Sequence, residues 1–315
     1  MSIKVAIQMD PIGSINFKGD STLRLGFEAQ ARGHELYYYT PNSLSLRGSD
    51  VIAHAYPIRL RNDPEHYYEL AKPVLLDLRS MDVVLLRQDP PFNMPYITTT
   101  YMLERLMPDV LVVNNPMSVR NHPEKLFPMQ FAQFMPPTLV SSDVNEIAKF
   151  RAEHKDIIIK PLYGFGGRAV LRVKADDDNF EALLEMQFSA SDEPVVVQAF
   201  LPEVKTGDRR IILIDGKFGG AIGRIPAEGE IRANMRVGGT PVKAELTPKQ
   251  KDICDALGPV LKEQGIMFAG IDVIGDWLTE INITSPTGLV PIEKLYGKNL
   301  AVDFWDAVDS RIKSR

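Results

Sequence analysis

Short apolar runs alternate with amphipathic stretches through the first third of the chain. A helix is expected from Asp20 or Ser21, either of which can cap its start, to Gly33, and a second helical stretch covers 101–107. This alternation predicts an α/β unit over residues 1–122, with a mostly parallel sheet covered on both faces. Its buried strands are expected at 3–9, 35–39, 83–86 and 110–113.

Two polar residues mark one edge of this expected sheet. Asp10 follows the first apolar run and Arg87 follows the third. Ligands of such sheets lie beyond the carboxyl ends of the strands, so both residues are candidates for a site, with ordinary surface loops as the alternative. No Gly-x-Gly-x-x-Gly motif follows the first run, which disfavours a dinucleotide-binding unit.

The pattern changes near residues 121–123. A smaller α+β unit is expected over 123–197 and a third unit over 198–315. Residues 219–242 hold six glycines and little periodicity, so we expect a long loop, which in a compact domain is usually functional. Beyond residue 122, one helix is expected to start at 123, and further helices are expected at 142–154, 180–186, 247–265 and 302–315. Extended segments are expected at 136–140, 157–160, 169–173, 194–200 and 210–214.

Polar side chains interrupt the apolar stretch 272–287. Asp272, Glu280 and Asn282 stand where a hairpin would normally bury Val or Leu. Burying a carboxylate is unfavourable unless a cation meets it, and converging oxygen donors are what a hard cation such as Mg²⁺ requires. The alternative is a solvated edge hairpin, which the apolar residues on its other face disfavour.

The spacing within this hairpin sets a condition. Glu280 and Asn282 are two residues apart and share a face of a strand. Asp272 shares that face only if the connection is symmetric about Asp276. We therefore expect a loop of three or five residues, and not the two-residue turn that Gly275 and Asp276 suggest.

A glycine-rich segment follows three isoleucines and begins at Lys160. Gly164, Gly166 and Gly167 allow backbone N–H groups to approach an anion closely. The segment lacks the Gly-Lys-Ser/Thr ending of a Walker loop and leads into a second strand. We interpret it as a hairpin flap that closes over phosphates, and a plain glycine-bearing hairpin is the alternative.

Other residues can complete a nucleotide site. Lys125 and Lys160 can neutralise phosphate charge. Gln198, Phe200 and Leu201 end an apolar strand and can form a slot for adenine, although Phe200 and Leu201 also suit a simple core.

Composition narrows the classes of function. The 315 residues include 44% hydrophobic and 24% charged residues, as is ordinary for a globular protein of two or three lobes. A net charge of −5 without a basic cluster disfavours nucleic-acid binding. One cysteine, Cys254, excludes an internal disulfide framework, and no apolar run is long enough for a membrane span. We expect a cytoplasmic protein with no membrane or nucleic-acid partner.

The order of these motifs resembles the ATP-grasp superfamily and, more narrowly, the bacterial glutathione synthetases. The motifs extend over nearly the whole chain, and the first and last of them begin and end at residues 9 and 287. They are Met-Asp-Pro-Ile (9–12), Arg-Gln-Asp-Pro-Pro-Phe (87–92), Glu-Lys-Leu-Phe (124–127), Ile-Lys-Pro-Leu (159–162) and Leu-Thr-Glu-Ile-Asn-Ile-Thr-Ser-Pro-Thr (278–287).

The resemblance implies a fold and a reaction. The fold is an N-terminal Rossmann-like parallel-sheet domain (1–122), a small ATP-grasp subdomain with the flap (123–197) and a C-terminal subdomain with the metal site (198–315). The reaction joins γ-glutamylcysteine to glycine through an acylphosphate, using ATP and Mg²⁺, with Mn²⁺ as an alternative metal. The family suggests a homo-oligomer, a dimer or a tetramer.

The resemblance also assigns residues. Metal ligands fall on Asp272, Glu280 and Asn282, and the nucleotide lysines on Lys125 and Lys160. Arginines expected to handle anionic substrate and transition-state charge are Arg209, Arg210, Arg224 and Arg232. Expected substrate contacts are Arg87, Asp208, Asn234, Ser285 and Thr287.

Two departures and three alternatives accompany this resemblance. Ala199 stands where the family often has a polar residue, and Pro128 is expected to disturb the helix after Lys125. The alternatives are another ATP-grasp peptide ligase, an ATP-grasp kinase and a non-catalytic nucleotide sensor.

Overall fold

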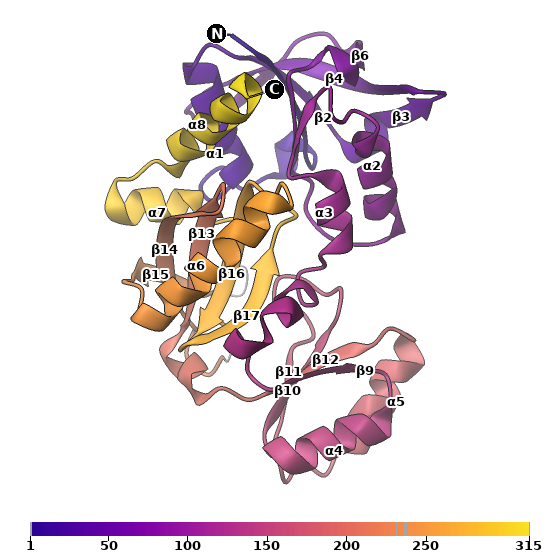
Figure 1. Ribbon diagram of the computed structural model, residues 1–315, viewed down its shortest axis with the longest axis vertical. Helices are drawn as coiled ribbons and strands as arrows, with labels where there is room; N and C mark the ends of the chain where they lie inside the picture. The colour runs from indigo at the N-terminus through magenta and orange to yellow at the C-terminus, as the bar shows by residue number, and fades with distance from the viewer. Residues whose placement is uncertain (1, 231, 236–237, 315) are drawn as a thin grey trace.

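The computed structural model describes residues 2–230, 232–235 and 238–314, and these residues form three sheets. In Figure 1 the N-terminal sheet lies at one end of the molecule, a small sheet at the other, and a third sheet between them. No helix in these ranges is both long and apolar enough to cross a membrane. The predicted fold class, a mixture of α/β and α+β units, is confirmed.

The N-terminal sheet has a parallel centre, as expected. Alternate residues of its first strand enter two cores: Val5 and Ile7 face α1, whereas Ala6 faces α2 and α3. Both faces are therefore covered. The centre consists of β2 (Glu35–Tyr39), β1 (Lys4–Gln8), β7 (Val83–Leu86) and β8 (Leu111–Val113), with helices α1 (Ser21–Ala31), α2 (Met94–Glu104) and α3 (Pro116–Asn121).

Helix α1 begins where the sequence predicts, because the Asp20 side chain caps it by accepting a hydrogen bond from the Leu23 N–H. It ends at Ala31, shortly before Gly33. Helix α2 starts seven residues before the expected 101, at a cap formed by Asn93. A run of β-branched residues in its middle obscured this helix in the sequence.

Four antiparallel strands extend this sheet beyond β2, and the sequence analysis missed them. β4 alternates buried and exposed positions along much of its length, so it covers the core with one face only. The four strands are β3 (Leu44–Arg47), β4 (Asp50–Leu60), β5 (Tyr68–Leu70) and β6 (Val74–Asp77).

The small sheet is fully antiparallel, in the order β11-β10-β12-β9. The glycine segment joins β10 to β11 as a hairpin, which confirms the expected second strand and rules out a Walker loop, whereas closure over phosphates stays a prediction. The helix expected from 123 is instead a 3-10 helix, η4 (Phe127–Phe134), with Pro128 in its first turn. The bounds are β9 (Thr138–Ser141), α4 (Val144–His154), β10 (Ile157–Pro161), β11 (Leu171–Val173), α5 (Phe180–Ala190) and β12 (Val195–Ala199).

The third sheet is antiparallel in the order β15-β14-β13-β16-β17. Alternate residues of β13 pack toward α6 on one face and toward α7 and α8 on the other. The bounds are β13 (Asp208–Ile214), β14 (Lys217–Ile225), β15 (Thr240–Lys243), α6 (Pro248–Glu263), β16 (Phe268–Ile274), β17 (Trp277–Asn282), α7 (Leu289–Tyr296) and α8 (Leu300–Lys313). Four further short 3-10 helices cover Ile12–Ser14, Pro41–Ser43, Leu78–Ser80 and Pro202–Thr206.

The expectation of one long loop over 219–242 is wrong at both ends of this range, because the first residues belong to β14 and the last to β15. Glycines within β14 reflect close packing and not loop structure. A Cβ atom at Gly220 would lie 3.1 Å from Ile292 and 3.4 Å from Leu300, so a larger residue would press against the side chains of α7 and α8. Between these strands, the described residues 226–230, 232–235 and 238–239 lie outside both of them, and residues 231 and 236–237 of the expected loop lie outside the described ranges.

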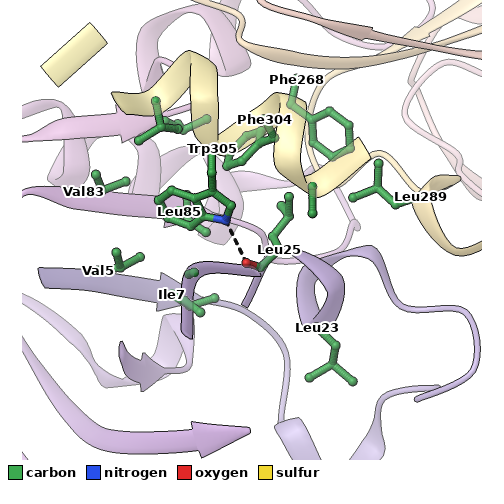
Figure 2. Packing of buried hydrophobic residues seen from close by; sticks show 14 of the residues in the cluster. Val5, Ile7, Leu23, Leu25, Val83, Leu85, Phe268, Leu289, Phe304 and Trp305 are labelled. Carbon is green, nitrogen blue, oxygen red and sulfur yellow. Dashed lines mark hydrogen bonds between the residues drawn. The ribbon is translucent and has the colours of Figure 1, made fainter. Parts of the chain in front are cut away.

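A shared core ties the C-terminal helix to the N-terminal sheet. Phe304 and Trp305 of α8 are buried, with exposed fractions of 1% and 0%. The Trp305 indole N–H donates to the carbonyl of Leu25 at 2.8 Å (Figure 2). Phe304 and Trp305 therefore pack inside the chain as part of its core.

Candidate active site

The β16–β17 hairpin places Asp272 opposite Glu280, but by a different route from the one expected. Gly275 and Asp276 form a two-residue turn, and Gly275 adopts a φ of +58°. Thr279 is then bulged out, which shifts the register so that Asp272 pairs with Glu280. The expected three- or five-residue loop is therefore wrong, although the shared face it was meant to explain is present.

The oxygen donors of the predicted metal site lie on adjacent positions of this hairpin. Asp272 is 3% exposed, and Glu280 forms an ion pair with Lys160 at 3.3 Å. Asn282 pairs with Gly270, and its Nδ2 is buried with no hydrogen-bond partner. Among the described residues no three His, Cys, Asp or Glu side chains gather as a metal site. The predicted set is two carboxylates and an amide, and these oxygen donors suit a hard cation.

Two arginines form ion pairs with the Asp272 carboxylate. Arg210 lies opposite Asp272 in the sheet register and donates to both of its oxygens, at 2.6 and 2.9 Å. Arg224 approaches Asp272 at 3.1 Å and holds Asp208, its own cross-strand partner, at 2.7 and 2.5 Å. Antiparallel pairing alone therefore builds this buried network of two arginines and two aspartates.

The network shifts the ionisation of its members. Burial opposes the charge of Asp272, but Arg210 and Arg224 lower the pKa of this carboxyl to about 2. Burial likewise opposes the charge of Arg224, and Asp272 and Asp208 raise its pKa above the ordinary value of a guanidinium. Both groups are charged at neutral pH. Arg209 faces away from the network, and its guanidinium donates to the Asp208 carbonyl at 3.4 Å.

The two predicted lysines are buried beside these carboxylates. Lys125 and Lys160 are 4% and 6% exposed. Lys125 Nζ donates to the carbonyls of Gly164 and, at 3.5 Å, of Leu162, so it holds the base of the flap. Each lysine is thus aimed into the space between the flap and the hairpin.

Glu124 is a site residue that the sequence analysis did not single out. Its side chain lies 3.4 Å from Lys125 Nζ, and its carbonyl accepts a hydrogen bond from the Ile281 N–H at 3.1 Å. Burial and the neighbouring charge of Glu280 raise the pKa of Glu124 to about 7. Its position next to Lys125 in the Glu-Lys-Leu-Phe motif was the signal that could have found it.

A cavity of about 900 Å³, counting space open to solvent, lies between the small sheet and the β16–β17 hairpin. It brings together thirteen of the predicted residues. These are Lys125, Lys160, Gly164, Gly166, Gly167, Gln198, Phe200, Leu201, Asp208, Arg232, Asn234, Asp272 and Glu280. The Gln198 side chain is engaged with Thr138, to which it donates at 3.0 Å.

Arg232 and Asn234, which lie between β14 and β15, meet the flap over this cavity. Arg232 donates to the Gly167 carbonyl at 3.2 Å and forms an ion pair with Glu230 at 2.5 Å. A Cβ atom at Gly167 would lie 3.2 Å from Asn234 Oδ1. Flap and loop therefore form one cover.

Other predicted residues lie outside the cavity, at the junction with the N-terminal sheet. Arg87 is 5% exposed and donates to Thr22 at 3.1 Å and to the Pro286 carbonyl at 3.0 Å. Ser285 donates to the Arg87 carbonyl at 3.2 Å. The Thr287 carbonyl accepts from Arg210 at 3.2 Å, which links this junction to Asp272. Asp10, the other edge residue, accepts a hydrogen bond from the Asp89 N–H at 2.7 Å.

Comparisons with known proteins cover the whole chain. Residues 3–120 match the N-terminal domain of prokaryotic glutathione synthetase, and residues 124–297 match its ATP-grasp domain. The glutathione synthetase of Rhodopseudomonas palustris is 54% identical over 99% of both chains, and that of Pseudomonas putida is 41% identical over 100% of both.

Solved structures add a likeness of fold. D-cycloserine synthetase DcsG has a TM-score of 0.69 at 15% identity over 98% of this chain and 99% of its own. D-alanyl-alanine synthetase A of Vibrio cholerae has a TM-score of 0.62 at 15% identity over 99% of both chains.

Proposed function

This chain belongs to the prokaryotic glutathione synthetase family, and we propose that it joins γ-glutamylcysteine to glycine with cleavage of ATP to ADP and phosphate. It is an ATP-dependent carboxylate–amine ligase with an ATP-grasp fold. The observation that carries the proposal is the full-length similarity, joined to a cavity in which a glycine flap, two buried lysines and paired carboxylates face one another.

The reaction requires activation of a carboxylate. An oxygen of the cysteinyl carboxylate attacks the γ-phosphorus of ATP, and ADP leaves. The glycine amine then attacks the carbonyl carbon of the acylphosphate, loses a proton, and expels inorganic phosphate. No protein nucleophile takes part, so the protein contributes positioning and charge neutralisation.

The residues that line the cavity indicate how the nucleotide would be held. Backbone N–H groups of the flap and the ammonium groups of Lys125 and Lys160 would contact the phosphates. Phe200 and Leu201 would form the adenine wall. Asp272, Glu280 and Asn282 would hold a divalent cation, Mg²⁺ or alternatively Mn²⁺. When bound, this cation neutralises charge on the β- and γ-phosphates.

The acceptor side of the site follows from the arginine network. An anionic substrate competes with Asp272 and Asp208 for the guanidinium groups of Arg210 and Arg224. We assign the transition-state charge to Arg210 and Arg224 rather than to Arg209, because only those two join the network. Arg232 would act from the cover.

The remaining assignments concern substrate contacts and assembly. Asp208 would meet the substrate ammonium, while Arg87, Ser285 and Thr287 would shape the acceptor end beside Arg210, and Asn234 would contribute from the loop. We also propose a cytoplasmic homo-oligomer, a dimer or a tetramer, on the family resemblance and the single cysteine.

The test is an assay of ADP release by the purified chain with product mass detection. ADP release that requires both γ-glutamylcysteine and glycine, with glutathione as product, is expected. A stable phosphorylated product formed without an amine would identify a kinase, and turnover only with another acceptor would identify a different ligase. No ADP release with any combination would leave the non-catalytic sensor.

A further inference from the structure

One cation at the cavity differs from the others. Lys125, Lys160, Arg168 and Arg232 all line it. Three of them have an acidic partner: Lys125 pairs with Glu124, Lys160 with Glu280 and Arg232 with Glu230. Within the described ranges, Arg168 has no ion pair to a carboxylate.

Arg168 lies on the glycine flap. It follows Gly166 and Gly167, whose φ angles are +64° and +75°, and its N–H closes a turn onto the Phe165 carbonyl at 3.4 Å. Its guanidinium carbon lies 5.5 Å from the centroid of the Phe165 ring. A cation–π contact of this kind holds an exposed guanidinium in one place without consuming its N–H donors.

The balance of charges in the cavity favours an anionic ligand for Arg168. Four carboxylates line it, those of Glu124, Asp208, Asp272 and Glu280, against four cations. A polyphosphate adds further negative charge, so an unpaired guanidinium on the cover is the donor that remains for it.

We propose that Arg168, which lies on the flap at the edge of the cavity, binds the phosphate tail of the nucleotide, as a contact additional to the flap backbone and the two lysines. This inference rests on the proposed function, since it takes the cavity to be the nucleotide site. Phe165 is its positioning residue: it holds the guanidinium over the cavity before ligand arrives.

The experiment compares Arg168→Ala with Lys174→Ala, which removes an exposed cation from the same hairpin but outside the cavity. Titration calorimetry of the full chain with ADP and with adenosine separates phosphate from base contacts. Arg168→Ala is expected to weaken ADP about tenfold, the effect of about one charge-assisted hydrogen bond, and to leave adenosine unchanged. The salt dependence of ADP affinity should fall in this variant, and Arg168→Lys should restore part of the affinity.

The contrary results are specific. ADP binding by Arg168→Ala within about twofold of the parent chain would overturn the phosphate contact while leaving the proposed function intact. Equal weakening of ADP and adenosine would overturn it too, because the loss would then lie in the base or in the flap fold. If the unaltered chain ligates no substrates and binds no ADP, the proposed function and this inference fail together.

Discussion

At Asp272, three hydrogen bonds from two guanidinium groups meet one carboxylate that is almost sealed from solvent. Arg210 supplies two of these bonds and Arg224 the third. A cation bound at Asp272 and an anionic substrate bound at the arginines would each relieve the pairing that holds the other partner. The network therefore couples occupation of the two halves of the site.

Asp272→Asn tests the energetics of this network. The change leaves two buried arginines short of a charge, so we expect the free energy of unfolding to fall by ~3–5 kcal/mol at neutral pH. Folding lowers the pKa of Asp272 from its ordinary 3.8 to about 2, so this stabilisation is present above pH 3.8 and is lost as the pH falls toward 2.

Urea unfolding of both proteins as a function of pH, without nucleotide or metal, measures this difference. The gap between the two curves should be constant from neutral pH down to the ordinary pKa and should narrow below it. A gap that is absent at neutral pH, or that widens in acid, would show that the arginines do not hold this carboxylate.

Glu280→Gln tests the metal assignment. A carboxamide keeps the size of the side chain but removes the negative charge that a divalent cation requires, so turnover should fall about 100-fold or more. Steady-state kinetics at varied Mg²⁺ concentration measures the loss, and circular dichroism checks the fold. Glu263→Gln, an exposed glutamate on α6, is the control and should retain full turnover. Near-normal rates for Glu280→Gln would remove this residue from the site.

Most site residues could be found from sequence at this scale, because charged and amide groups inside apolar runs are conspicuous. Their partners could not. Arg210 with Asp272 and Arg224 with Asp208 are cross-strand pairs, and only the register of three strands brings them together. Arg209 and Arg210 are neighbours in sequence, but alternation along β13 gives only Arg210 to the network.

At the scale of elements, many strands and helices were predicted, whereas the four strands β3 to β6 and the irregular features were not. The bulge at Thr279 follows no residue signal, yet it decides which face Glu280 occupies. The glycines of β14 indicated a loop in the sequence, whereas in the structure they lie in a strand whose Gly220 packs closely against α7 and α8. Both cases depend on contacts between elements, which a single sequence does not display.

The flap should change its mobility with ligand. In this structure Lys125 and Arg232 bond the flap carbonyls of Gly164 and Gly167. Phosphates would add bonds to the flap N–H groups. Hydrogen exchange of a peptide covering 162–170 should therefore slow by about tenfold or more when ADP and Mg²⁺ are added. A peptide from α6 serves as the internal control. Identical exchange of the flap peptide in both states would contradict a closing cover.

At the scale of the whole molecule, the first and last segments share one core. Figure 2 shows Trp305 and Phe304 of α8 packed beside Val5, Ile7 and Leu85 of the N-terminal sheet. The sequence predicted the α/β class and the separate sheets, but it could not place α8 against α1, because that contact joins opposite ends of the chain. The unit boundaries near 122 and 197 stay predictions.

Trp305→Ala tests this shared core. Removal of a fully buried indole should destabilise the chain by ~3–5 kcal/mol, and the N-terminal sheet and α8 should unfold together. Trp305→Phe keeps a ring and loses only the hydrogen bond to Leu25, so its loss should be smaller. Thermal unfolding followed by circular dichroism and by hydrogen exchange measures both. A Trp305→Ala chain as stable as its parent would show that α8 is not part of the N-terminal core.

The most direct test of the central claim follows an oxygen atom. When γ-glutamylcysteine carries ¹⁸O in its cysteinyl carboxylate, activation of that carboxylate by ATP must transfer one labelled oxygen to each inorganic phosphate released with glutathione. Mass spectrometry of the phosphate reads this out, and we expect one ¹⁸O per phosphate. Unlabelled phosphate would mean that water, and not the substrate carboxylate, attacks ATP, and the chain would not be the ligase described here.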